Sequence, residues 1–211
     1  MIWDDKGYLI SKIKYNENSV IAEFYTKNHG KTSGIIFGAS SKKIKNYLLI
    51  GNKFFLNFNG KNEGKIGYFK LEIDKINTPV YFDNKKKLFL IIYAMNLLRF
   101  LTVENQQNLS LYLNLKDFFK ILNKDNWIKN YILWELNFLK DIGYDLDFKN
   151  YAVRENINGS NKYVVKSNNA TRIIPNFLIN NADNPENNEE IIIPLKLVGD
   201  FLDKSILKPN N

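Results

Sequence analysis

A short run near residue 40 carries the residue types that bind phosphate groups. Ser40-Ser41-Lys42-Lys43-Ile44-Lys45 brings three ammonium groups and two hydroxyls together, and side chains of these types commonly contact phosphate oxygens. The run joins two predicted strands and can therefore project freely, while Gly34, Gly38 and Ala39 nearby would let a nucleic-acid backbone approach closely. Taken alone, the run is explained equally well as an ordinary solvated lysine loop.

Further cationic residues lie on the neighbouring predicted strands and turns, where we expect them to share one surface with the lysine run. Tyr8, Tyr15 and Tyr25 are either stacking faces for unpaired bases or core residues, and the sequence leaves both interpretations open. The predicted nucleic-acid contacts are Lys12, Lys27, His29, Lys31, Lys42, Lys43 and Lys45.

Residue types for catalysis or metal binding are sparse. The absence of cysteine excludes disulfides, thiol catalysis and Cys-ligated zinc, and His29 is the only histidine. Gly30-Lys31-Thr32 is similar to the end of a P-loop, but the required earlier glycine falls at Tyr25 and the segment leads into a strand. Asp145 and Asp147 fit a polar turn better than a carboxylate pair. We therefore expect no enzymatic activity, no cofactor and no metal site.

The charge distribution favours a polyanionic partner for the first third of the chain. The net charge is +8, and residues 1–80 contribute 13 Lys and Arg against 7 Asp and Glu. A basic surface attracts phosphate polyanions through counterion release. All but three of the basic residues are lysine, a bias that A/T-rich codons also produce, so total charge alone is weak support.

The first 78 residues predict a small β-barrel. Short apolar runs alternate with polar residues and are separated by turns that contain Asn and Gly. Five such strands in so short a segment fit an OB-type barrel, with a simple antiparallel sandwich as the competing architecture. The predicted strands are residues 8–15, 20–25, 34–37, 51–58 and 67–76.

After Thr78-Pro79 the apolar period becomes helical. Residues 88–102 are apolar nearly all round and predict a helix buried in the middle of a bundle. Gly143 suits the position that closes the helix before it. The other expected elements are helices at 108–122 and 127–142, a short hairpin at 151–167 around Asn158-Gly159, a mobile loop at 180–190 and a last helix opening at Pro194.

These patterns predict an α+β protein of two domains. Residues 1–78 form the expected OB-fold DNA-binding domain, and residues 79–211 form a helical domain with a small zinc-free hairpin insertion. The most apolar run, residues 88–101, is interrupted by Asn96 and Arg99 and is shorter than the roughly 20 residues that span a bilayer. The N-terminus lacks the features of a signal peptide. We therefore expect a cytoplasmic, nucleoid-associated protein that does not engage membranes.

The order of several short motifs resembles that of the bacterial DNA repair protein RecO family. Near the N-terminus the family has a glycine-bearing first strand, then a Glu-x-Ser turn, a Thr-x-x-x-Gly turn and a Gly-x-x-Ser-x-Lys loop. The corresponding segments here are Asp5 to Ile10, Tyr15 to Ser19, Thr26 to Lys31 and Gly38 to Lys43. Farther on, Trp134-Glu135-Leu136 and Ile142 to Asp147 are similar to the family's Trp-Glu-Leu and Leu-Gly-Phe-x-Leu-Asp stretches.

The resemblance implies a recombination mediator without catalytic residues. Members of the family bind single- and double-stranded DNA, anneal complementary strands and help to load RecA. They pair with RecR and with the C-terminal tail of single-strand binding protein. Many members also carry paired cysteines for a zinc ribbon, and the positions of the first pair are Tyr151 and Arg154 here. This chain must therefore hold that region together without zinc.

Two other interpretations remain open. OB-type barrels also bind RNA, so an RNA- or ribosome-binding protein is the first alternative. The second is a scaffold that binds only protein, whose lysine excess reflects codon bias. Salt-dependent binding to nucleic acid separates these two alternatives, because the RNA- or ribosome-binding protein predicts it and the protein-only scaffold does not.

Overall fold

The computed structural model describes residues 1–60, 66–157, 159–167 and 170–203. The chain divides into two compact units, Met1–Lys116 and Asp117–Asn211. The boundary expected at residue 78 remains a prediction, and the change from strands to helices occurs next to it. Asn158 of the predicted hairpin turn lies outside the described residues.

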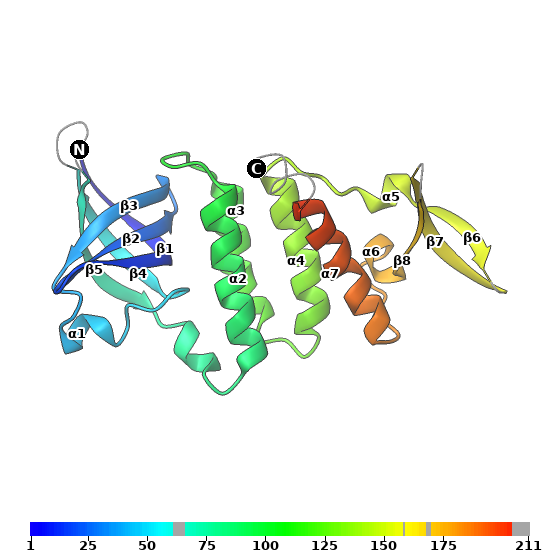
Figure 1. Ribbon diagram of the computed structural model, residues 1–211, viewed down its shortest axis with the longest axis horizontal. Coiled ribbons are helices and arrows are strands. Elements are labelled where there is room, and N and C mark those ends of the chain that lie inside the picture. The colour runs from blue at the N-terminus through cyan, green and yellow to red at the C-terminus, as the bar shows by residue number, and fades with distance from the viewer. Residues whose placement is uncertain (61–65, 158, 168–169, 204–211) are drawn as a thin grey trace. The chain divides into compact units, whose positions relative to one another are not determined.

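Five strands of the first unit form a closed barrel, which confirms the OB-type prediction (Figure 1). The strand order is β1-β2-β3-β5-β4, and β1 also pairs with β4 to close the sheet. Neighbouring strands are antiparallel except β3 and β5, which are parallel. The strands are β1 Ile2–Asn16, β2 Ser19–Thr26, β3 Gly30–Phe37, β4 Lys53–Asn59 and β5 Tyr68–Lys75.

Two strands begin earlier than the sequence predicts. β1 starts at Ile2 and not at residue 8, and β3 starts at Gly30 and not at residue 34. The start of β1 contains Asp5, a residue type that is depleted in strands. Its carboxylate is nevertheless buried, because it accepts hydrogen bonds from the backbone and side-chain nitrogens of Asn28. These tertiary hydrogen bonds stabilise a strand that local preference disfavours.

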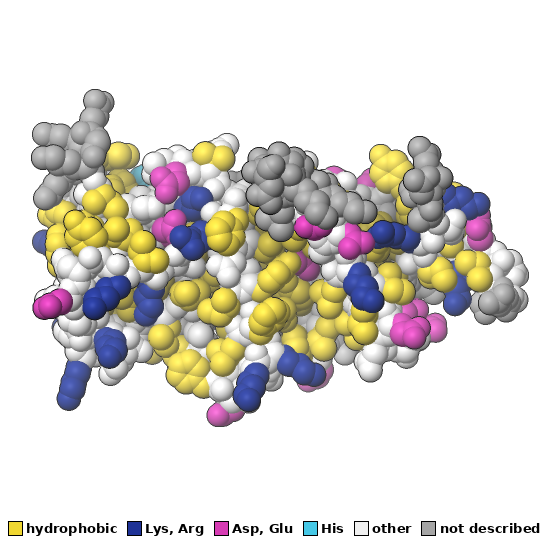
Figure 2. All heavy atoms as spheres, viewed as in Figure 1, with side chains coloured by type: hydrophobic (Ala, Val, Ile, Leu, Met, Phe, Trp, Pro, Cys, Tyr) yellow, Lys and Arg dark blue, Asp and Glu magenta, His cyan; other side chains and the backbone are white. Residues whose placement is uncertain are grey.

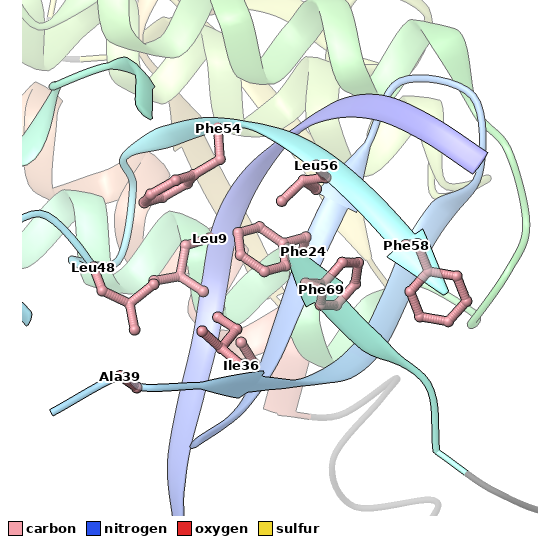
Figure 3. Close-up of a cluster of buried hydrophobic side chains, with 10 residues drawn as sticks. Leu9, Phe24, Ile36, Ala39, Leu48, Phe54, Leu56, Phe58 and Phe69 are labelled. Atoms are coloured by element: carbon pink, nitrogen blue, oxygen red, sulfur yellow. The ribbon is translucent and has the colours of Figure 1, made fainter. Parts of the chain in front are cut away.

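The barrel encloses an aromatic and aliphatic core (Figure 3). Phe54, Leu56 and Phe58 of β4 point inward, as their alternation predicts, while Phe55 is 45% exposed. Phe24 packs edge-on against Phe69 with ring centroids 5.0 Å apart. The core residues are Leu9, Ala22, Phe24, Ile36, Ala39, Leu48, Phe54, Leu56, Phe58 and Phe69.

Gly34 serves this core, and not the close approach of a nucleic-acid backbone that the sequence predicts. A Cβ atom at Gly34 would lie 2.6 Å from Cε2 of Phe69, well inside van der Waals contact. The absence of a side chain therefore lets the Phe69 ring lie against β3. Gly38, which follows β3, has a φ of +69° and open space around it, so only its backbone conformation requires glycine.

Helices continue the first unit after the barrel. The 3-10 helix η1 (Thr78–Tyr81) leads to α2 (Lys85–Leu101) and then to α3 (Leu109–Ile121), whose last residues belong to the second unit. The expectation that residues 88–102 are buried all round is wrong. The buried residues Ile91, Ala94, Met95, Leu97 and Leu98 define one side of α2, whereas Phe89 and Phe100 are 67% and 71% exposed. The apolar composition of α2 therefore reflects an unburied face as well as a packed one.

The second unit combines helices with a small sheet. Helix α4 (Trp127–Asp141) buries Tyr131 and Trp134, so these aromatic residues belong to the core. The helix ends as predicted at Gly143, which has a φ of +97°, while the Tyr144 amide donates to the carbonyl of Leu139. The remaining elements are α5 Phe148–Tyr151, β6 Val153–Ile157, β7 Ser160–Ser167, β8 Ala170–Ile174, α6 Asn176–Ile179 and α7 Asn188–Leu202.

The sequence-based prediction was wrong about two elements of this unit. The hairpin of β6 and β7 gains a third strand, β8, which pairs antiparallel with β7. The last helix begins at Asn188, inside the expected mobile loop, so Pro194 lies in its interior and does not open it. The Asn187 side chain caps the helix by accepting a hydrogen bond from the Glu190 amide, which explains the earlier start.

The contact between Gly34 and Phe69 predicts a cost for adding one methyl group. Gly34→Ala should lower the free energy of unfolding by about 1–3 kcal/mol, because the ring must shift within a packed core. Gly199→Ala in α7, where a Cβ meets nothing within 4 Å, should raise it by up to about 1 kcal/mol. Urea denaturation followed by circular dichroism measures both. Equal stability of wild type and Gly34→Ala would show that the core accommodates the methyl group.

Candidate nucleic-acid interface

The structure separates the seven predicted contact residues into two groups. Lys12, Lys42, Lys43 and Lys45 lie where the turn between β1 and β2 approaches the segment after β3, because the Ala39 amide donates to the Asn18 carbonyl. Lys27, His29 and Lys31 lie at the turn between β2 and β3. These turns are at opposite ends of β2, whose 8 residues span roughly 25 Å. One compact ligand group therefore cannot contact both groups.

A hollow of about 320 Å³ lies at the first of these two ends. We call it the basic groove. Three ammonium-bearing residues and two serines contribute to its wall, together with apolar side chains and one acidic residue. The lining residues are Lys12, Ile13, Lys14, Asn16, Glu17, Ser19, Val20, Ala39, Ser40, Lys45 and Leu48.

Strand register positions the lysines on one wall of the basic groove. Lys12 lies opposite Ala22 and Lys14 lies opposite Val20. Ala22 belongs to the barrel core and Val20 packs against it, so the two lysines lie on the inward-facing side of β1, at the end of the barrel. Lys14 was missing from the predicted contacts, although its spacing of two residues from Lys12 places both on one face of a strand.

Helix α1 (Lys42–Lys45) positions the wall of the basic groove that lies opposite β1. The sequence predicts a freely projecting loop here, but the segment is one short helical turn whose Ile44 packs against the barrel core. Leu48, four residues later, is buried in the same core. This apolar pair anchors the segment and leaves Lys42, Lys43 and Lys45 exposed. The lysine run is thus presented on a fixed support.

The groove holds positive charges close together. The Lys12 ammonium donates a hydrogen bond of 2.5 Å to the carbonyl of Leu48. Burial lowers the pKa of Lys12 below its ordinary value, and the neighbouring charge of Lys45 lowers it further. Among the described residues, no carboxylate forms an ion pair with Lys12, Lys42, Lys43 or Lys45. An anion placed between these groups would therefore relieve their mutual repulsion.

His29 and Lys31 hold partners within the protein. The His29 ring stacks on Trp3 with centroids 4.0 Å apart, and its Nδ1 lies 3.1 Å from the buried carboxylate of Asp5. The Lys31 ammonium donates to the carbonyl of Arg99 at 2.7 Å. DNA contact by Lys27, His29 and Lys31 remains a prediction, while two of these side chains have a structural role that the sequence does not reveal.

A larger hollow of about 670 Å³ next to Lys27 has a different character. Its wall combines Lys6, Lys27 and Lys70 with Asp4, Asp5 and Glu72, whereas the basic groove has the single carboxylate of Glu17 beside three lysines. Carboxylates beside cations reduce the local positive potential, so this hollow suits a phosphate chain less well than the basic groove.

The structure decides the role of two of the three candidate stacking tyrosines. Tyr8 and Tyr25 are 3% and 1% exposed and are core residues. Tyr15 is 56% exposed, near the end of β1. Among the described residues, no group of His, Asp or Glu is arranged to hold a metal ion, and no helix has the length and apolarity needed to cross a membrane.

A closed five-stranded barrel with a basic groove beside its first turn belongs to the OB-type barrels, a class that binds oligonucleotides and oligosaccharides. Family models refine this class. The model for the recombination protein O N-terminal region matches residues 1–73, and the model for its C-terminal region matches residues 84–202. The chain therefore belongs to the recombination protein O (RecO) family.

Individual relatives agree with this membership. A protein named DNA repair protein RecO from Wolbachia sp. subsp. Drosophila simulans is 26% identical over 222 residues, which cover 97% of this chain and 92% of the relative. A protein of the same name from Rickettsia typhi is 34% identical over 149 residues, which cover 71% of this chain and 63% of the relative. The names of these relatives describe DNA repair and no enzymatic reaction.

Lys31 and Lys42 should respond differently when their charge is removed. Lys31→Met should lower the free energy of unfolding by about 1–2 kcal/mol, because it removes a charged hydrogen bond to a backbone carbonyl. Lys42→Met, at an exposed site, should change it by less than about 0.5 kcal/mol. Urea denaturation measures both. Similar effects of the two substitutions would contradict the structural role of Lys31.

Proposed function

We propose that this protein binds single- and double-stranded DNA through the basic groove and acts as a recombination mediator in DNA repair. The convergence of Lys12, Lys14 and Lys45 on one groove, with no paired carboxylate among the described residues, is the observation that carries the proposal. The names of the family and of its DNA repair relatives support the biological role.

Strand annealing and RecA loading are consistent with a groove of this kind. Two complementary strands repel each other through their phosphates, and a cationic surface that binds both lowers this repulsion. Such a role needs positioned charge and no catalytic residue. The residues that we propose to contact phosphate are Lys12, Lys14, Lys42, Lys43 and Lys45. We also propose that the protein acts on DNA in the cytoplasm.

The exposed face of α2 supports a second part of the proposal, the engagement of RecR and the tail of single-strand binding protein. Phe89 and Phe100 are among its exposed apolar residues, and the Phe89 ring stacks on Tyr93. Lys85 and Lys86 are exposed at the start of the same helix. An acidic peptide with an apolar end would find both apolar contacts and cations on this face.

Salt-dependent DNA binding tests the groove. The triple variant Lys42→Gln, Lys43→Gln and Lys45→Gln should bind single-stranded DNA more weakly, with a salt slope shallower by up to about 2, because each lost phosphate contact removes about 0.7 from the slope. Fluorescence anisotropy across a salt series measures both quantities. The matched control replaces Lys85, Lys86 and Lys116, which are also exposed in the first unit.

Equal losses in the two triple variants would show that total charge, and not the groove, determines binding. Absence of salt-dependent DNA binding in the wild type would overturn the proposal and favour the protein-only scaffold. Tighter binding of RNA than of DNA in competition would favour the RNA-binding alternative.

A labelled peptide with the sequence of the single-strand binding protein tail tests the α2 face. The double variant Phe89→Ala and Phe100→Ala should weaken peptide binding by about tenfold or more, because two exposed aromatic contacts are lost. DNA binding should be unchanged. Leu113→Ala on α3, where the side chain is 46% exposed, is the control. Unchanged peptide affinity in the double variant would place the peptide elsewhere.

A further inference from the structure

One half of the outward face of β1, β2 and β3 is covered by the protein's own helical segment. The Arg99 side chain of α2 forms an ion pair with Glu23 of β2 at 2.6 Å, and the Arg99 carbonyl accepts the hydrogen bond from Lys31 of β3. Tyr8 of β1 packs against Tyr112 of α3 with centroids 5.8 Å apart. OB-type barrels commonly bind oligonucleotides on the face of strands 2 and 3. Here that part of the face is occupied.

The other half of the same face is open and apolar. Ile36 and Phe69 belong to the core, so their neighbours in the chain, Phe37 and Tyr68, point outward. The Phe37 and Tyr68 rings lie 5.9 Å apart and are tilted by 55°. We call this half the outer apolar surface. Its residues are Ile13, Ile21, Phe37 and Tyr68, of which Phe37 is 56% and Ile13 is 54% exposed.

Strand pairing, together with the contact between the Phe37 and Tyr68 rings, makes these four residues contiguous. Ile13 lies opposite Ile21, which in turn lies opposite Ile35 of β3. Ile35 pairs with Tyr68 across the parallel contact between β3 and β5. The surface therefore crosses four strands, and the buried Ile35 lies in its middle.

The outer apolar surface meets the basic groove at the hairpin of β1 and β2. Ile13 lies between Lys12 and Lys14 in the chain and lines the groove with them. Phe37 lies opposite Ser19, another groove residue, and is followed by the segment that carries Lys42 and Lys43. Figure 2 shows hydrophobic side chains gathered over the strands of the barrel, with Lys and Arg side chains toward its α1 end. The cations of the basic groove therefore lie next to the aromatic rings of the outer apolar surface.

We propose that Phe37 and Tyr68 stack on unpaired bases of single-stranded DNA whose phosphates lie in the basic groove. This inference rests on the proposed DNA-binding function and specifies its preferred substrate. Bases of a single strand are free to stack on aromatic side chains, whereas bases in a duplex are already stacked on each other. The surface consequently gives the protein a preference for single strands that the lysines alone cannot give, because phosphates are common to both forms.

Substitutions at Phe37 test the stacking without removing charge. Phe37→Leu keeps an apolar side chain but removes the ring, and it should weaken binding to a labelled single strand by about tenfold. The salt slope should be unchanged, because no phosphate contact is lost. Affinity for the matching duplex should also be unchanged. Phe37→Trp should restore or increase single-strand affinity, since it returns a ring to the same position.

The control uses another exposed phenylalanine of the barrel. Phe55 on β4 is 45% exposed, and the Lys6 ammonium lies 4.2 Å from the centre of its ring. Phe55→Leu should leave affinity for both forms of DNA unchanged. Thermal unfolding of each variant checks that the barrel is intact, which is expected because both rings are exposed.

The outcomes separate this inference from the function on which it rests. A loss of DNA binding that is equal for single strand and duplex, or equal in Phe37→Leu and Phe37→Trp, contradicts base stacking. If Phe37→Leu binds single strands as tightly as the wild type does, and the salt slope still depends on the lysines, base stacking is wrong but the proposed DNA binding stands. The outer apolar surface would then fit a protein partner. Absence of DNA binding in the wild type overturns both.

Discussion

The length of β1 determines most of what the first unit presents to a ligand. Its first part pairs with β4 as far as Tyr8 opposite Lys53, and this pairing closes the barrel. A bulge follows at Ile10, and the strand then continues alongside β2 as far as Asn16. The extension carries Lys12 and Lys14 beyond the end of β4, so that the basic groove forms between it and the segment that contains α1. Without the extension, β1 would still pair with β4 as far as Tyr8, but it would lose most of its pairs with β2 and the basic groove would lose one wall.

The two ends of the barrel use similar residues for different purposes. At the turn between β2 and β3, His29 and Lys31 bind a buried carboxylate and a backbone carbonyl, and they thereby hold the turn and the helical segment in place. At the turn between β1 and β2, lysines face each other across the groove without carboxylate partners among the described residues. Lys12 also donates to a backbone carbonyl, so the difference between the two ends lies in the clustering of Lys12, Lys14 and Lys45, whose fields add and favour an anionic ligand.

Local patterns were sufficient where burial alternates regularly, and insufficient where tertiary contacts decide. The inward series Phe54, Leu56 and Phe58 and the helix end at Gly143 follow from period and from glycine conformation. The start of β1 does not follow from local pattern, because the burial of Asp5 depends on Asn28 and His29, which lie more than 20 residues away in the chain. For the site, the lysine run was visible in the sequence. Its position across the groove from Lys12 depends on the packing of Ile44 against the barrel core. The contact between Lys31 and Arg99 joins residues 68 positions apart, so local patterns do not predict it either.

The extension of β1 also creates a free strand edge. Beyond Leu9, whose backbone exchanges hydrogen bonds with Gly51 and Asn52, the strand has no backbone partner on the β4 side among the described residues, so backbone donors and acceptors there are available for another chain. Lysines on exposed edges oppose such pairing, because two copies brought edge to edge would repel each other. Lys12 and Lys14 are therefore also suited to keep copies of the protein apart, and phosphate bound to them would remove that protection locally. The charges that oppose edge-to-edge pairing at Lys12 and Lys14 are thus the same charges that a bound polyanion would neutralise.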